Sequence, residues 1–140
     1  MIHGRCHCGN IEFDLSWPVE TDEIPVRACS CSFCTKHRGV YTSHPEAELD
    51  AHIEDRAAVN RYTFGTGTAE FFVCSRCGVV PFVTSNIDGR LFAVVNVNTF
   101  DPDAALSFDC ATTTFDGEDT ESRLARRSRT WISNVRVFGV

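Results

Sequence analysis

Short apolar stretches recur along the chain, and most of them have the length of β-strands. Residues 11–15 (IEFDL) alternate apolar and polar side chains, as a strand with one buried face does. Residues 69–73 (AEFFV) and 79–83 (VVPFV) flank the segment CSRCG and predict two strands joined by a tight turn. Residues 91–100 (LFAVVNVNTF) are rich in Val and Phe, and the dipeptide DG at 88–89 is a turn signal. This pattern predicts a mainly β fold of short, mostly antiparallel strands.

Helical signals are weak and fall in two segments. Residues 45–59 have a helix-forming composition and begin with a proline that suits a first helical turn. Only three of their apolar residues form a stripe, so we predict a turn or two of helix there. Residues 119–130 carry four arginines and predict a short, solvated helix. The sequence therefore predicts little helix.

Length, composition and charge are typical of one globular domain covering residues 1–140. A hydrophobic fraction of 43% and eleven Phe are enough for a single packed core. The net charge of -6 argues against general affinity for nucleic acid or anionic membranes. We find no apolar run of membrane-spanning length, and the first nine residues lack the apolar core of a signal peptide. We therefore expect a cytoplasmic protein with reduced thiols.

Seven of the eight cysteines fall into three clusters, which are the strongest chemical signal in the sequence. The clusters are Cys6-x-Cys8, Cys29-x-Cys31-x-x-Cys34 and Cys74-x-x-Cys77. Thiolates are soft ligands that suit zinc, and closely spaced thiols let one turn supply two ligands. Disulfides are the alternative, but cysteines two positions apart in an extended chain point to opposite faces and pair poorly. The clusters therefore predict zinc sites.

The number of clustered cysteines is compatible with two kinds of zinc site. A structural site is closed by four protein ligands, whereas a catalytic site keeps one position open. Seven cysteines divide into a set of four (Cys6, Cys8, Cys74 and Cys77) and a set of three (Cys29, Cys31 and Cys34). Spacing alone does not force this division, because Cys74 and Cys77 could instead complete a site with part of the triplet. Spacing also leaves open whether every zinc is structural.

The segments around these cysteines resemble the glutathione-dependent formaldehyde-activating enzyme family, which includes centromere protein V. The matching motifs are GRCHCG (4–9), CSCSFCTK (29–36), YTFGTG (62–67), FVCSRCGVVPF (72–82) and SNIDGR (85–90). They occur in the family's order within residues 4–101. The resemblance implies a β-tent fold, in which small sheets surround zinc-knuckle sites, and two zinc ions per chain.

The resemblance also implies a carbon–sulfur lyase that interconverts glutathione plus formaldehyde with S-hydroxymethylglutathione. It assigns Cys6, Cys8, Cys74 and Cys77 to a structural zinc, and Cys29, Cys31 and Cys34 to a catalytic one. Three anionic sulfurs make zinc a poor Lewis acid, so we expect it to deliver a thiol or to exchange ligands. Cys31 is our candidate for the sulfur that leaves the metal during turnover. The expected partner is a small thiol such as glutathione.

The remaining candidates have simpler interpretations. Cys110 lies outside every cluster and is expected to be a small buried hydrophobic residue. His37 could reach the open zinc position, but a solvent-facing loop histidine is the favoured interpretation. The arginines within residues 123–129 could bind the carboxylates of a glutathione-like ligand or an acidic partner, although a solvated face is the commoner explanation. A zinc-stabilised binding module without turnover is the alternative function.

Overall fold

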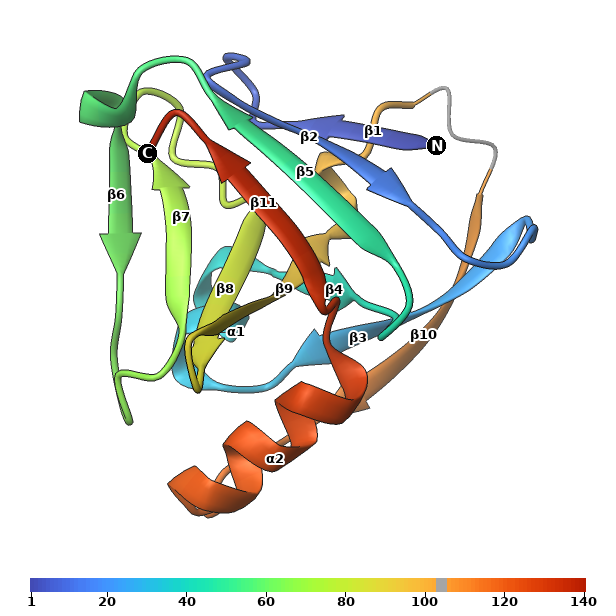
Figure 1. Cartoon of the computed structure of the whole chain (residues 1–140), viewed down its shortest axis with the longest axis vertical. Helices are drawn as coiled ribbons and strands as arrows, with labels where there is room; N and C mark the ends of the chain where they lie inside the picture. The colour runs from blue at the N-terminus through green and yellow to red at the C-terminus, as the bar shows by residue number, and fades with distance from the viewer. Residues whose placement is uncertain (103–105) are drawn as a thin grey trace.

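The computed structural model describes residues 1–102 and 106–140, which form two sheets and confirm the predicted mainly β class (Figure 1). The first sheet contains, in spatial order, β1 (Ile2–Arg5), β2 (Ile11–Ser16), β5 (Glu48–Ile53) and β11 (Asn134–Phe138). The second contains β10 (Ser107–Thr113), β3 (Glu23–Cys29), β4 (Val40–Thr42), β9 (Arg90–Asn96), β8 (Phe82–Ile87), β7 (Glu70–Cys74) and β6 (Val59–Tyr62). Most neighbours pair antiparallel, but β10 with β3 and β11 with β5 are parallel pairs.

Helical structure in these residues is limited to short segments. They are α1 (Ser32–His37), α2 (Thr120–Thr130) and the 3-10 turns η1 (Arg56–Ala58) and η2 (Val97–Thr99). The predicted helix over 119–130 is thus confirmed as α2, which lies at the bottom of the molecule in Figure 1. No helix in the described ranges combines the length and the hydropathy needed to cross a membrane.

The core lies where the inner faces of the two sheets meet. Alternate residues of β2, including Phe13 and Leu15, are buried in one cluster with Phe72 and Phe82 of the second sheet. The rings of Phe72 and Phe82 stack with centroids 4.5 Å apart. Because burial of aromatic and aliphatic side chains is the main driving force of folding, this cluster fixes the two sheets against each other.

The turn or two of helix predicted within residues 45–59 appears only as the 3-10 turn η1, and the centre of the segment is a strand. Residues 48–53 form β5, in which Leu49, Ala51 and Ile53 are all buried. Leu49 and Ile53 are four positions apart, a spacing that fits both a helix and a strand, and the buried Ala51 between them decides for the strand. Pairing of β5 with β2 on one side and β11 on the other then satisfies its backbone groups. Only η1 retains a helical turn.

The other local predictions hold with small shifts in their boundaries. The strands predicted at 11–15 and 69–73 appear as β2 and β7. Asp88 and Gly89, with φ of 53° and 80°, form the predicted tight turn between β8 and β9. The strand predicted at 79–83 begins only at Phe82, because the preceding residues close the turn that follows the Cys74-x-x-Cys77 pair.

Candidate metal centres and an adjoining cavity

Four cysteines from two distant turns meet in one cluster. Cys6 and Cys8 lie in the turn between β1 and β2, whereas Cys74 ends β7 and Cys77 lies in the turn after it. All four sulfurs are within 4.8 Å of one another, with Sγ of Cys8 3.5 Å from Cys74 and 3.8 Å from Cys6. A tetrahedral zinc with Zn–S bonds of about 2.3 Å requires sulfurs about 3.8 Å apart. The donor set therefore fits four-coordinate zinc.

Backbone N–H groups point at the sulfurs of this cluster. The amide of Ile11 donates to Sγ of Cys6 over 3.4 Å. Burial opposes ionisation of Cys77, but hydrogen bonds from the backbone N–H groups of Val79 and Cys8 and from neighbouring cysteine thiols together outweigh it and lower the pKa of Cys77 to about 6. For Cys6, burial and the hydrogen bonds of its thiol to the neighbouring cysteines outweigh the Ile11 amide and raise the pKa to about 12. The turns thus supply the donors that stabilise metal-bound thiolates.

The remaining three clustered cysteines form a second group, whose sulfurs also lie within 4.8 Å of one another. Cys29 ends β3, Cys31 is the N-cap of α1, and Cys34 lies inside that helix. Sγ of Cys31 accepts the backbone N–H of Cys34 over 3.4 Å. The sequence did not reveal α1, because the helix is only six residues long and its cap is a cysteine rather than Ser, Thr, Asp or Asn.

The thiols of Cys29 and Cys34 have pKa values shifted in opposite directions. A hydrogen bond from the Cys34 thiol, aided by the backbone amide of Cys31, lowers the pKa of Cys29 to about 5. The same contact with Cys29, together with burial, raises the pKa of Cys34. The group therefore holds a thiolate readily, which is the form that ligates metals.

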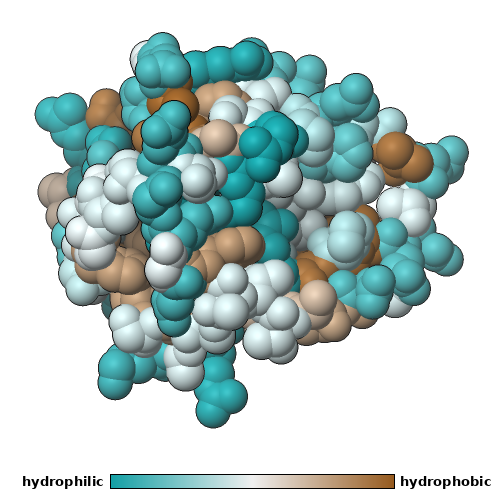
Figure 2. Space-filling model, turned by 90° about the horizontal axis from the view of Figure 1, so that it is seen from below, coloured by the Kyte–Doolittle hydropathy of each residue, from teal (hydrophilic) through white to brown (hydrophobic). Residues whose placement is uncertain are grey.

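A cavity of about 380 Å³ adjoins the cysteine triplet, and Cys29, Cys31 and Cys34 all line it. A metal held by the three sulfurs would therefore have a side from which a ligand in the cavity could approach. The volume is in the range of small-molecule sites. Aromatic and charged side chains share the rest of the wall. These include Phe64, Phe71, Trp131, Arg27 and Arg127. The face of the molecule that carries α2 is largely hydrophilic, with smaller hydrophobic areas between (Figure 2).

Three of the predicted arginines contribute to this cavity, so the prediction of a solvated face is wrong for them. Arg123, Arg126 and Arg127 line the cavity, and only Arg129 is fully on the outside. Their spacing of three and four residues puts them on one face of α2. Sequence reasoning missed Arg27, although it lies two positions before Cys29 on β3, where strand alternation puts both side chains on one face.

Two further predictions are also corrected. Cys110 is exposed rather than buried, because it lies on β10, an edge strand that pairs only with β3. His37 is half-buried on α1 instead of lying in a solvent-facing loop. Its Nε2 is 3.1 Å from the hydroxyl oxygen of Tyr41, its ring packs on Phe33, and burial lowers its pKa.

Comparison with known proteins gives one family and one similar fold. The model of the family described as glutathione-dependent formaldehyde-activating enzyme matches residues 1–115. A crystal structure of a Rhodobacter sphaeroides protein resembles this chain with a TM-score of 0.52 and 23% sequence identity. The likeness covers 78% of this chain and 99% of that one, and at this identity it shows the fold alone. Helix α2 lies beyond the span that the family model matches.

Proposed function

The chain belongs to the glutathione-dependent formaldehyde-activating enzyme family, and we propose that it is a zinc-dependent carbon–sulfur lyase acting on thiol adducts of formaldehyde or a related small carbonyl. In the synthetic direction the thiol sulfur forms a bond to the carbonyl carbon, and the thiol proton ends on the new hydroxyl oxygen. Cleavage is the exact reverse. The observation that carries the proposal is the position of the cysteine triplet, whose three sulfurs lie on the wall of a ligand-sized cavity.

The two cysteine groups have different proposed roles. We assign Cys6, Cys8, Cys74 and Cys77 to a closed structural zinc, and Cys29, Cys31 and Cys34 to a second zinc with an open position. The sulfur separations in the first group and the shared cavity wall of the second support this division. Zinc bound by the triplet would favour the thiolate form of an incoming thiol. Both groups need reduced cysteines, in keeping with the expected cytoplasmic location.

Cys31 is the proposed exchanging sulfur of the triplet. It is half-buried, whereas Cys34 is only 3% exposed and has little room to move. The N–H that Cys31 accepts from Cys34 would stabilise its thiolate after it leaves the metal.

Tyr41 is the proposed hydrogen-bond donor for the carbonyl oxygen. Its side chain is buried, lines the cavity, and pairs through its hydroxyl with Nε2 of His37 at 3.1 Å. Burial raises its pKa, so the phenol keeps its proton and can donate. A donor at this oxygen stabilises the charge that develops while the carbon–sulfur bond forms or breaks.

The test is the exchange of formaldehyde with S-hydroxymethylglutathione at equilibrium, followed by NMR exchange spectroscopy. Thiols add to formaldehyde quickly without a catalyst, so the measured quantity is the acceleration over a sample without protein. We expect the zinc-containing protein to accelerate exchange and Cys29→Ser to abolish the acceleration. A folded protein with two zinc ions that neither accelerates exchange nor binds glutathione would contradict the proposal. It would favour a binding module without turnover.

A further inference from the structure

We propose that Arg27 and Arg127 form a carboxylate-binding subsite in the cavity and are the residues that determine its preference for thiols bearing a carboxylate. The thiol part of this statement rests on the proposed function. The carboxylate part rests on the other residues that line the cavity with the cysteine triplet. The family match ends at residue 115, so the match itself does not imply a role for α2.

Unpaired buried polar atoms gather at this cavity. In the part of the chain that the structure describes, three buried side-chain polar atoms have no hydrogen-bond partner: Nε of Arg123, Nε of Arg127 and Oγ1 of Thr113. All three belong to residues that line the cavity. Buried donors without partners are costly and rare in folded proteins. The protein's own groups thus leave several buried polar atoms of the cavity-lining residues unsatisfied.

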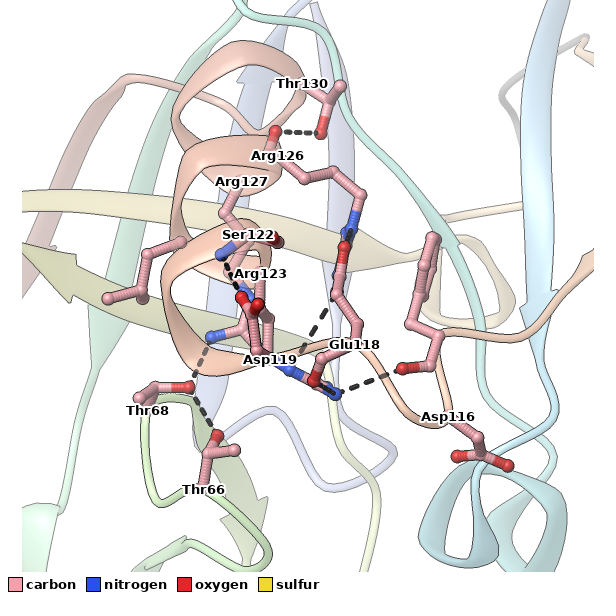
Figure 3. A network of polar contacts seen from close by, with 12 residues as sticks. Thr66, Thr68, Asp116, Glu118, Asp119, Ser122, Arg123, Arg126, Arg127 and Thr130 are labelled. Carbon is pink, nitrogen blue, oxygen red and sulfur yellow. Dashed lines mark hydrogen bonds and ion pairs between the residues drawn. The ribbon is translucent and has the colours of Figure 1, made fainter.

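Arg127 is a buried cation whose contacts are neutral. It is 6% exposed, and its Nη1 donates to Oγ1 of Thr68 over 2.8 Å (Figure 3). The same Nη1 donates to Oγ of Ser85 over 3.2 Å. Within residues 1–102 and 106–140 no carboxylate lies within ion-pair distance of it. Its guanidinium carbon also lies 4.9 Å from the centroid of the Trp131 ring, and this partner is uncharged as well. A buried guanidinium of this kind is stabilised by an anion that enters from the cavity.

Arg27 is a second cation without a carboxylate partner in the described residues. Its Nη2 donates to Oγ of Ser43 over 2.9 Å, and that hydroxyl donates in turn to the carbonyl oxygen of Thr130, the last residue of α2. This chain of contacts ties β3 to the helix that carries Arg127. Because this side-chain contact is with a neutral hydroxyl, the guanidinium would gain from an anion in the cavity that it lines.

The nearby carboxylates do not neutralise these two arginines. Glu118 is committed to Arg126, with its nearest contact at 3.1 Å, and reaches Arg123 at 3.9 Å. Asp116 lines the cavity, but no ion pair joins it to an arginine, and no dashed line reaches it in Figure 3. Four arginines therefore line the cavity with one carboxylate, that of Asp116, which leaves a surplus of positive charge for a ligand.

The distance from this subsite to the triplet defines the shape of the ligand. Arg27 and Cys29 are alternate residues on one face of β3, so their backbone positions are about 7 Å apart. Tyr41 lies directly opposite Arg27 in the pairing of β3 with β4 and lines the same cavity. A ligand that reaches both the arginines and the triplet therefore has its carboxylate several bonds from its sulfur. Glutathione and shorter thiol acids both have this form.

The experiment measures ligand binding separately from thiol chemistry. S-methylglutathione keeps both carboxylates but has no free thiol, and its dimethyl ester removes the two negative charges. Each is titrated by calorimetry into the whole, zinc-containing protein and into the variants Arg27→Met, Arg127→Met and Arg129→Met. Arg129 is exposed on the same helix and does not line the cavity, so its variant controls for the loss of one positive charge.

We expect the wild-type protein to bind the acid at least about tenfold more tightly than the ester. Arg27→Met and Arg127→Met should each weaken binding of the acid by about ten- to a hundredfold, and Arg129→Met should not. Equal affinity for acid and ester, or unchanged binding of the acid in the folded arginine variants, would overturn the subsite. If Arg127→Met fails to fold, the Arg27→Met variant and the comparison of acid with ester still test whether the subsite exists.

Formaldehyde exchange with glutathione, measured on the same samples, separates the two proposals. Accelerated exchange combined with arginine-independent binding of the acid would refute the subsite and leave the lyase function intact. Arginine-dependent binding without any acceleration would support the anion subsite and refute the lyase function, and with it the thiol part of the inference.

Discussion

Replacement of Arg127 by methionine is expected to stabilise the protein while it weakens the binding of carboxylates. The native side chain buries a charge beside neutral partners and near two other arginines of α2. Burial and these like charges lower the pKa of Arg127 to about 10, which shows that the folded protein disfavours its charged form. Methionine has a flexible apolar side chain that can fill much of the same space.

The expected magnitude follows from the contacts that change. Exchange of a buried charge for a well-packed apolar residue is often neutral or stabilising by about 1–4 kcal/mol. The variant loses a cation–π contact with Trp131, worth about 0.5–2 kcal/mol, but a sulfur–aromatic contact can replace part of it. The two hydroxyls keep other partners, because Ser85 donates to the carbonyl oxygen of Thr68, and Oγ1 of Thr68 lies 2.8 Å from Thr66. A net gain of about 1–2 kcal/mol is therefore expected.

Thermal unfolding followed by circular dichroism checks this prediction at fixed zinc concentration. For a chain of this length each kcal/mol corresponds to about 3–4 °C, so Tm should rise by about 3–8 °C. Arg129→Met, on the exposed side, should change stability by less than about 0.5 kcal/mol. S-methylglutathione should raise the Tm of the wild-type protein more than that of the variant. A loss of stability of more than about 2 kcal/mol in Arg127→Met would show that the arginine is a structural element, and the reasoning would fail.

Three further predictions concern the metal centres and the site. Cys74→Ser should unfold or aggregate, because metal binding supplies folding energy, whereas Cys29→Ser should stay folded with one zinc fewer. Circular dichroism and native mass spectrometry report both, and equal loss of folding would contradict the division into four and three. Native mass spectra of the wild-type protein should show two zinc ions and a glutathione adduct, and a chelator should remove the ion of the triplet first because it has fewer protein ligands. Tyr41→Phe should slow formaldehyde exchange about tenfold or more with both zinc ions retained, and an unchanged rate would exclude the phenol as donor.

Features that depend on neighbouring residues could be predicted from the sequence. The alternation in residues 11–15 and the turn at 88–89 are local signals, and both appear where expected. Residues 48–53 were misassigned because two apolar residues four apart fit either period. The parallel pairings of β3 with β10 and of β5 with β11 leave no local mark, since each joins segments more than 80 residues apart.

In the candidate site, too, only the features set by residues close together in the sequence could be predicted. Cysteine spacing indicated metal chemistry, because a tight turn presents thiols to one ion without help from the rest of the fold. The buried arginines could not be found this way. The environment of Arg127 is set by Thr68 and Ser85, which are 59 and 42 residues away in the chain. The arginines of α2 would suit a helix exposed to water, and they line the cavity only because α2 packs beside the second sheet.

The parallel pairing of β11 with β5 has a consequence for synthesis on the ribosome. Asn134 pairs with Glu48, so 86 more residues must be synthesised before this edge of β5 can begin to pair with β11. At 5–20 residues per second this interval lasts roughly 4 to 17 s. During that time the nascent chain presents an open strand edge with buried-type residues such as Leu49 and Ile53, which invites pairing with other chains. Helix α2 immediately precedes β11, so the cavity wall is also completed only at the end of this vulnerable interval.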